Sequence, residues 1–477
     1  MMSKLCYISA IEAIDKFRNG DLSPVELMQA VIDQAEKVQP TVNAFSHTFF
    51  DEAMEQAKQS ELRYRDGTAR PLEGIPVAIK DEADHKGKPN TNGSLLLKDH
   101  VAEESSVMVQ RLLDAGAIVH ARAAVPEFCL HSCTWSKLYG VTRNPWSPEH
   151  SAGGSSGGSG AALAAGMTTL ATGSDIGGSI RVPASHNGVV GFKPPYGRIP
   201  DGPLWNRDAY CHNGPMARTV ADAALFENVI AGPHESDHVS IYPKLVLPAE
   251  YEDIKGMKIA YTIDFGYREI DEDVRNNTLA AVERLRSLGA LVEEVELNWS
   301  PKCDQAALAH LYFGAGNVVK KDLQANGLAE KADQLTSYIS AFFERADNTS
   351  MSDFLDGKAI EAEMAQDIGK LFSEYDALVC PTLSTAEVKA DWDPTITPIT
   401  INNKPAYGLL AEMCTHYFNI LSRCPVLSVP SGRASNNVPT GLQIVGPTYR
   451  DEVPFRIASA YESTYQLFVG DEFPLFG

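Results

Sequence analysis

The feature of this sequence that most limits how it can fold is a segment dominated by glycine, serine and alanine. Residues 150–191 contain the run Gly-Gly-Ser-Ser-Gly-Gly-Ser-Gly at 153–160 and a second glycine pair further on, just before Ser179. Such runs often form flexible linkers. This run leads directly into the alanine-rich residues 161–166, which are typical of a buried helix. We therefore expect a backbone that approaches its neighbours closely or adopts positive φ angles.

Composition places the chain among ordinary soluble globular proteins. Of its 477 residues, 44% are apolar and 22% are charged, and the formal charge of −21 disfavours nonspecific binding to nucleic acid or anionic membranes. The sequence contains no run of about 18 apolar residues, so we expect no membrane span. The N-terminus carries charged residues and is unlike a signal peptide. The eight scattered cysteines fit a reducing compartment. We expect a cytoplasmic protein that binds neither nucleic acid nor membrane.

A metal site is the alternative role for two of the cysteines. Cys129 and Cys133 have the spacing of residues on one helix face, and His131 lies between them. A zinc site would need further ligands, and nothing nearby completes a set. We therefore expect no metal and no organic cofactor.

Signals for helices and strands alternate along the chain. Residues 23–26, Ser-Pro-Val-Glu, combine an N-cap serine, proline at the first helical position and a capping-box glutamate. Amphipathic patterns predict helices at 106–116 and 274–288. Short apolar runs predict buried strands at 74–79, 117–120, 257–261, 377–380 and 426–429. This alternation predicts a layered α/β architecture.

The residues around Ser179 point to nucleophilic chemistry. Gly177 and Gly178 precede this serine, and their N–H groups can turn toward one point to stabilise an anion beside the serine oxygen. A serine hydroxyl needs a base to take its proton. Lys80 ends the strand predicted at 74–79, and burial favours the neutral amine that can act as this base.

These motifs together resemble the amidase signature family. Ser155 and Ser179 lie 24 residues apart, as the two catalytic serines of that family do, and Lys80 precedes them. The resemblance is specific and covers most of the chain. It is carried by residues 144–146, 153–159, 173–184, 188–194, 197–198, 425–430 and 439–443.

The resemblance implies a fold. That fold is a single α/β/α domain over residues 1–477, with a large mixed central β-sheet flanked by helices. Residues 8–65 would form a helical N-terminal layer and residues 66–230 the signature core that holds the catalytic residues. Residues 231–477 would complete the sheet and shape the substrate pocket.

The resemblance also implies an amidase mechanism with a Ser-cisSer-Lys triad. Ser179 would attack the substrate carbonyl. Ser155, joined to Gly154 by a cis peptide bond, would pass the proton of Ser179 to Lys80, which would be the base. The partner would be a small-molecule amide, with esters or carbamates as further substrates, and homodimers occur in the family. The oxyanion hole would consist of the backbone N–H groups of Ile176, Gly177, Gly178 and Ser179.

Other residues near the motif have more ordinary roles. His186 follows Ser179 closely enough to suggest a Ser-His pair, but we expect a packed or hydrogen-bonded histidine. Asp175 and Arg181 are expected to support the nucleophile loop rather than to take part in the chemistry. Four residues are candidates for the acyl pocket, with core packing as an equal alternative: Cys129, Cys133, Trp135 and Tyr139.

Three other functions fit parts of the sequence. Residues 153–157 match the G-x-S-x-G motif of α/β-hydrolase esterases, but no buried strand precedes them. A phosphate-binding loop would need a G-K-[ST] ending, which is absent. Within the family, the alternative is the glutaminase (A) subunit of a glutamyl-tRNA amidotransferase. Residues 198–217 differ from that subunit's usual sequence and resemble a stand-alone amidase, so we expect a self-sufficient enzyme.

Overall fold

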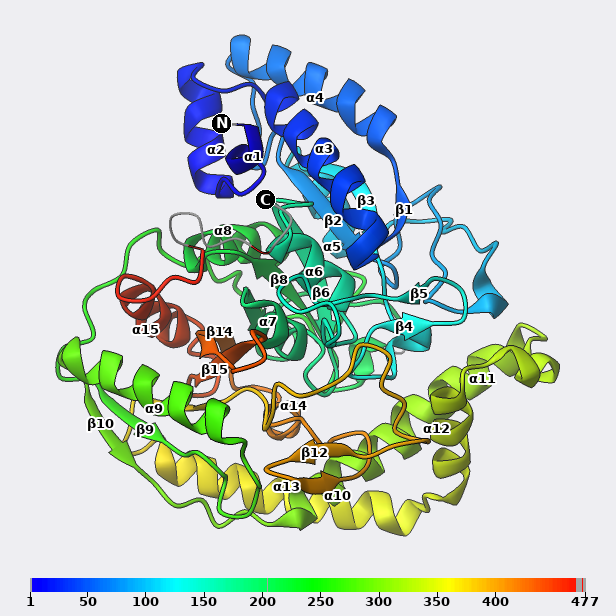
Figure 1. The fold of residues 1–477 in the computed structure, drawn as a ribbon, viewed down its shortest axis with the longest axis vertical. Helices are drawn as coiled ribbons and strands as arrows, with labels where there is room; N and C mark the ends of the chain where they lie inside the picture. The colour runs from blue at the N-terminus through cyan, green and yellow to red at the C-terminus, as the bar shows by residue number, and fades with distance from the viewer. Residues whose placement is uncertain (1, 204, 469–473, 475–477) are drawn as a thin grey trace.

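The computed structural model describes residues 2–203, 205–468 and 474 and is organised around one eleven-stranded sheet (Figure 1). The strand order is β1-β3-β2-β6-β8-β7-β14-β15-β11-β9-β10. The strands are β1 (Phe45–Thr48), β2 (Pro76–Lys80), β3 (Ile118–Ala123), β6 (Leu170–Asp175), β7 (Val190–Lys193), β8 (His212–Ala217), β9 (Lys258–Tyr261), β10 (Leu291–Glu294), β11 (Ala377–Pro381), β14 (Val426–Arg433) and β15 (Pro439–Val445).

The sheet is mixed. Strand β2 runs parallel to both β3 and β6, and β9 runs parallel to both β10 and β11. The strands between these two parallel groups pair antiparallel, as β1 and β3 also do. The expected α/β class with a large mixed central sheet is therefore confirmed.

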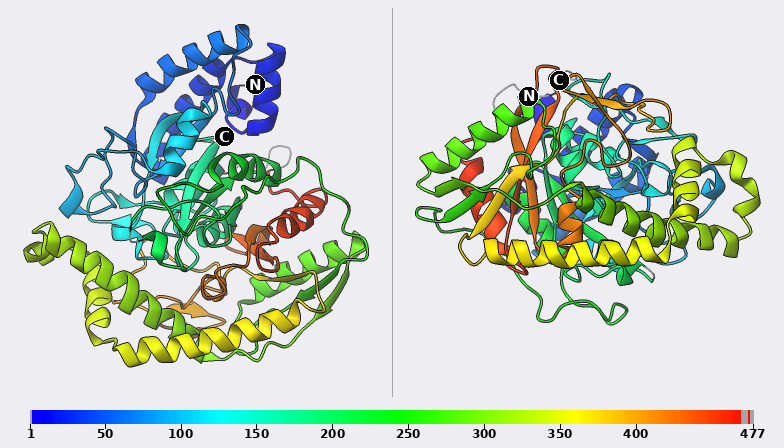
Figure 2. Two further views of the ribbon diagram at one scale, coloured as in Figure 1. Left: turned by 180° about the vertical axis from the view of Figure 1, so that it is seen from behind. Right: turned by 90° about the horizontal axis from the view of Figure 1, so that it is seen from below.

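Helices flank this sheet (Figure 2). Helices α2 to α4 lie at one end of the molecule, and α10 to α13 lie at the other end (Figure 1). The helices are α1 (Met2–Leu5), α2 (Ala10–Asn19), α3 (Pro24–Val42), α4 (Phe50–Arg65), α5 (Val107–Asp114), α6 (Gly157–Ala164), α7 (Arg181–Asn187), α8 (Val220–Ile230), α9 (Glu272–Ser287), α10 (Pro301–His310), α11 (Asn317–Ala325), α12 (Ser337–Asn348), α13 (Met351–Leu371), α14 (Tyr417–Ile420) and α15 (Glu452–Glu462). Two small hairpins pair β4 (Trp135–Ser136) with β5 (Gly140–Val141) and β12 (Ile399–Ile401) with β13 (Lys404–Ala406).

The two faces of the sheet pack against different cores, because successive side chains of a strand point to opposite sides. In β2, Val77 and Ile79 belong to the larger apolar core, whereas Ala78 belongs to a second core rich in alanine. The same alternation separates Leu170 from Ala171 in β6. Helices α6 and α7 contribute to the alanine-rich core, so small side chains let these two helices lie close to the sheet.

Several elements expected from the sequence form where predicted. The Ser23 hydroxyl accepts a hydrogen bond from the Val25 N–H, and the Glu26 carboxylate accepts one from the Ser23 N–H, which starts α3 as a capping box would. Strands β2, β3, β9, β11 and β14 and helices α5 and α9 overlap the predicted ranges.

The helix that follows the glycine run begins earlier than the sequence predicts. We expected a helix over 161–166, but α6 begins at Gly157, inside the run. A Cβ on Gly158 would lie 2.3 Å from the Ala124 backbone nitrogen, and one on Gly157 would lie 2.3 Å from the Thr134 hydroxyl oxygen. Close packing against the end of β3 therefore requires glycine here and overrides its weak helix propensity.

Cys129 ends a short 3-10 helix at Glu127–Cys129 and Cys133 lies beyond it, so the two cysteines do not share a helix face as their spacing suggested. Phe128 and Cys129 have φ angles of 52° and 58°, in the left-handed region that ends a regular helix. Over the described ranges, no helix is both long and apolar enough to cross a membrane.

Candidate active site

Lys80 lies at the C-terminal end of β2 and is completely buried. Its backbone N–H donates to the Thr172 hydroxyl at 2.9 Å, which ties β2 to the adjacent β6. Its amine Nζ lies 2.7 Å from Ser155 Oγ and 2.7 Å from Ser174 Oγ. The structure thus brings together two of the three residues expected to be catalytic, although 75 residues separate them in the sequence.

Ser155 follows a cis peptide bond from Gly154 and is almost fully buried. A Cβ on Gly154 would lie 2.7 Å from the carbonyl oxygen of His131, so the chain has room only for glycine at this point. The N–H of Ser156 donates to the Ser179 carbonyl at 3.2 Å. The loop that carries Ser155 therefore contacts the loop that carries Ser179 directly.

The loop between β6 and α7 holds Ser179 and the four residues expected to form an oxyanion hole. Among the described residues, no backbone or side-chain group accepts a hydrogen bond from the N–H groups of residues 176–179. The next N–H, that of Ile180, donates to the Asp175 carboxylate at 3.2 Å. Four successive donors are therefore available beside a serine, as stabilisation of a developing oxyanion requires.

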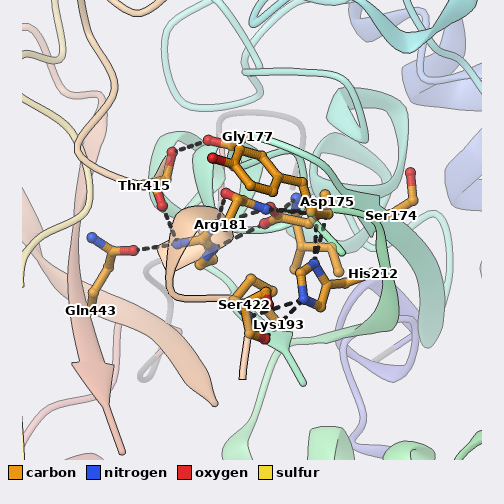
Figure 3. Close-up of polar contacts among 12 residues, drawn as sticks. Ser174, Asp175, Gly177, Arg181, Lys193, His212, Thr415, Ser422 and Gln443 are labelled. Atoms are coloured by element: carbon orange, nitrogen blue, oxygen red, sulfur yellow. Dashed lines mark hydrogen bonds and ion pairs between the residues drawn. The ribbon is translucent and has the colours of Figure 1, made fainter. Parts of the chain in front are cut away.

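Asp175 and Arg181 clamp this loop at its base (Figure 3). Two guanidinium nitrogens of Arg181 each lie 2.9 Å from a carboxylate oxygen of Asp175, and both side chains are buried. Burial alone would raise the pKa of Asp175, but the Arg181 charge and hydrogen bonds from Arg181 and Asn419 hold it well below its usual range. This pair anchors the loop that carries Ser179, and its support of catalysis stays a prediction.

Residues from the C-terminal half complete the clamp (Figure 3). Arg181 donates to the Gln443 side chain and to the Thr415 carbonyl, each at 2.8 Å. The Thr415 hydroxyl donates to the Gly177 carbonyl at 2.6 Å. Sequence reasoning missed the contacts of Thr415, Asn419 and Gln443. Gln443 lies in the motif at 439–443, but no motif indicates that these residues contact a side chain more than 230 positions earlier.

A second buried lysine, Lys193, lies near Arg181 and Asp175. Lys193 Nζ is 3.4 Å from the His212 ring nitrogen Nε2 and 3.3 Å from the Ser422 carbonyl (Figure 3). Burial and the nearby Arg181 charge lower the pKa of Lys193 to about 7. Burial and the Lys193 charge lower the pKa of His212 to about 3, so this imidazole is neutral at physiological pH.

Two hollows lie near the site, one lined by Ser174 and the other by Ser179. The larger, of about 900 Å³, is lined by polar residues that include Glu82, Ser174 and Asp201. A small slot of about 30 Å³ contacts Ser179 itself. Its walls are mostly apolar and come from distant segments: Cys129, Leu130, Ile176, Leu311, Phe342, Leu409, Leu410 and Met413.

Of the four residues considered for an acyl pocket, only Cys129 lines the slot. Cys133 packs in a separate apolar cluster with Trp392, and Trp135 packs against that cluster. Tyr139 contacts the His47 ring. For Cys133, Trp135 and Tyr139, core or surface packing is therefore the role that the structure supports.

Sequence reasoning also missed Glu82. Its carboxylate Oε2 lies 3.1 Å from Lys80 Nζ. Burial alone would raise the pKa of Glu82, but the Lys80 charge and contacts with Cys129, Ser174 and Lys80 hold it below the usual value. Its position two residues after the lysine was the available signal, but nothing indicated that the side chain turns back.

His186 has the role expected for it. The imidazole is completely buried and its Nε2 lies 3.1 Å from the Glu412 carboxylate. In the ranges that the structure describes, His, Cys, Asp and Glu side chains do not gather in a group that could hold a metal ion.

The family of the chain follows from its sequence and fold together. The family model described as Amidase matches residues 26–453. A bacterial aryl acylamidase of the amidase signature family superposes with a TM-score of 0.90 at 28% identity, covering 96% of each chain. This protein belongs to the amidase signature family. It is a hydrolase that acts on the carbon–nitrogen bonds of amides.

Curated relatives of two kinds are similar to the chain along nearly its whole length. The A subunit of the glutamyl-tRNA(Gln) amidotransferase from Exiguobacterium sibiricum is 33% identical over 470 residues, which cover 93% of this chain and 95% of the relative. The acylamidase of Rhodococcus erythropolis is 32% identical over 473 residues, covering 96% of both. Sequence identity alone does not separate the two kinds.

Proposed function

We propose that this protein is a self-sufficient amidase that forms an acyl-enzyme on Ser179. The observation that carries the proposal is the 2.7 Å contact between Lys80 Nζ and Ser155 Oγ, beneath a loop that presents Ser179 and the N–H donors of residues 176–179. An amine in contact with a hydroxyl can take its proton when the amine is neutral, and that hydroxyl can in turn take a proton from the nucleophile.

The reaction then has two steps, acylation of Ser179 and hydrolysis of the acyl-enzyme. Ser179 Oγ bonds to the amide carbonyl carbon while its proton passes to Ser155 and the Ser155 proton passes to Lys80. The N–H groups of residues 176–179 stabilise the oxyanion. The carbon–nitrogen bond breaks as Ser155 returns a proton to the leaving amine and is reprotonated by Lys80. Water then attacks the ester by the same relay and releases the carboxylic acid and free Ser179.

The slot beside Ser179 supports an apolar acyl group. Over the part of the chain that the structure describes, its walls include Leu311, Phe342 and Met413 and contain no Asp, Glu, Lys or Arg side chain. The one histidine among these wall residues, His131, is neutral because burial lowers its pKa to about 4. A glutaminase must bind the charged ammonium and carboxylate of glutamine, and an apolar slot would leave these charges unpaired. We therefore favour a short apolar acyl chain in the slot and the amine portion in the 900 Å³ cavity.

The test is hydrolysis by the purified chain alone. A panel would comprise anilides, alkyl amides, amino-acid amides, glutamine, and matched esters and carbamates, with product amine or ammonia measured directly. We expect short-chain anilides or alkyl amides to be cleaved without any partner, and Ser179→Ala to be inactive on all of them. Cleavage of glutamine alone, or activity only after a second protein is added, would favour the amidotransferase role instead.

A further inference from the structure

The hydrogen-bonding capacity of Lys80 draws attention to Glu82. A lysine ammonium has three N–H donors and no acceptor. Lys80 Nζ has three oxygen neighbours: Ser155 Oγ and Ser174 Oγ at 2.7 Å, and Glu82 Oε2 at 3.1 Å. The third of these is a carboxylate, so the buried amine lies in an environment complementary to its charged form.

We propose that Glu82 is a positioning residue for Lys80, which orients the amine toward Ser155 and sets the pH above which Lys80 works as a base. This inference rests on the proposed role of Lys80 as the base. Glu82 acts through Lys80 and has no direct part in bond making or breaking.

The direction of the effect follows from charge. A carboxylate within about 4–6 Å favours the protonated form of an amine, whereas burial favours the neutral form. Lys80 is completely buried, so the two influences oppose each other at one atom. Removal of the Glu82 charge should therefore favour the neutral amine, and we expect activity to begin at a lower pH in such a variant.

Glu82 is well placed for this role because it is ionised and reaches solvent. Its side chain is 22% exposed and lines the large cavity, so a proton leaving Lys80 has a short path to water. Ser174 contacts both Lys80 and Glu82. The Glu82 carboxylate thus lies between the buried Lys80 amine and the large cavity.

Other charged and titratable groups face Glu82 from neighbouring elements. From the loop after β3, the Cys129 thiol contacts it, and burial followed by the Glu82 charge raises the pKa of that thiol well above its usual value. Burial followed by the Glu82 charge likewise raises the pKa of Asp201 to about 6. The Glu82 charge also contributes to raising the pKa of Cys211, after burial, and opposes the lowering of the Arg122 pKa by burial. Among these groups, Lys80 is the cation in direct contact with Glu82.

The experiment is the pH profile of kcat/KM for Glu82→Gln, measured with an amide that the wild type cleaves. Glutamine keeps a hydrogen-bond acceptor beside Lys80 but removes the charge. We expect the acidic limb of the profile to move to lower pH by about 1 to 3 units. Glu82→Asp, which keeps the charge, should leave the limb closer to that of the wild type. The matched control is Glu103→Gln, which makes the same substitution at an exposed carboxylate outside that cavity and should leave the limb unchanged.

Each outcome decides the inference. An unshifted limb, or an equal loss of activity at every pH, would overturn it, because a merely structural glutamate would produce either result. Should Glu82→Gln not fold, as judged by thermal unfolding, Glu82→Met is the second variant and carries the same expectation. An inactive wild type, or an active Ser179→Ala variant, would instead contradict the proposed function. The pKa of Lys193 is also lowered, to about 7. If Lys193 set the acidic limb of the pH profile, substitution of Glu82 would not shift that limb.

Discussion

The hydroxyl of Thr415 donates a hydrogen bond to the carbonyl of Gly177 at 2.6 Å. In a planar trans peptide the carbonyl and the following N–H point in opposite directions. Holding the Gly177 carbonyl against Thr415 therefore turns the Gly178 N–H to the other side of the loop. A residue near the C-terminus thus fixes the orientation of one of the four N–H groups expected to bind the oxyanion.

Gly178→Ala should disable the enzyme. Gly178 has a φ angle of 141°, and a Cβ there would lie 2.0 Å from the Thr415 hydroxyl oxygen. The loop would have to move and its N–H donors with it, so we expect kcat to fall by about 10²–10³-fold. Gly177→Ala is the control, since its Cβ would meet the Met413 side chain at an ordinary 3.7 Å. Steady-state kinetics of both variants decide the matter, and equal kcat values would contradict the prediction.

Ser179→Ala should abolish hydrolysis and leave the fold intact, because no acyl-enzyme can form without the hydroxyl. A serine-directed fluorophosphonate should label the wild-type protein but not this variant. Mass spectrometry of the labelled digest should find the modification on the peptide that contains Ser179. Labelling at Ser155 instead would show that the two serines have been assigned to the wrong roles.

Lys80→Ala should remove most of the amidase activity, by about 10²–10⁴-fold. Activated esters should lose less than amides, because a phenolate leaves without the proton that an amine leaving group needs. Lys80→Arg should not restore activity, since arginine stays protonated and cannot accept a proton. The ratio of amide to ester turnover is the measurement, and near-normal amide turnover by Lys80→Ala would mean that another base is at work.

Asp175→Asn should destabilise the protein by about 3–5 kcal/mol at pH 7, because it leaves the buried Arg181 charge uncompensated. The pKa of Asp175 lies below its unfolded value. Its contribution to stability is therefore complete above about pH 4 and is lost as the pH falls through the folded-state pKa. Urea unfolding of wild type and variant should give a difference that is constant from pH 8 to about 5 and shrinks in stronger acid. A difference that does not change with pH would contradict this account.

Local signals predicted several secondary-structure elements of the N-terminal half. The capping box at Ser23 and the strand that ends at Lys80 depend on neighbours in the sequence, and the structure has both features. The start of α6 at Gly157 was missed, because it depends on how closely the helix packs against Ala124 rather than on helix propensity.

Contacts between distant segments could not be predicted in the same way. Gln443 reaches Arg181 from β15, in the middle of the sheet, and Thr415 reaches it from the segment before α14. The strand order that brings these segments together is not encoded by any local pattern. Glu82 was missed for a different reason. A charged residue after a strand usually faces solvent, and only the side-chain direction shows that it turns back toward Lys80.

The walls of the slot come from two separate parts of the chain. Cys129, Leu130 and Ile176 lie in the first two-fifths of the sequence together with Lys80, Ser155 and Ser179, whereas the other apolar wall residues lie much later: Leu311, Phe342, Leu409, Leu410 and Met413. With the acyl group in this slot, as proposed above, exchange of the later segment between relatives is expected to change which acyl group is accepted and to leave the proposed catalytic residues untouched. In evolution, new substrates can be acquired by drift in one half of the gene while the other half is held constant.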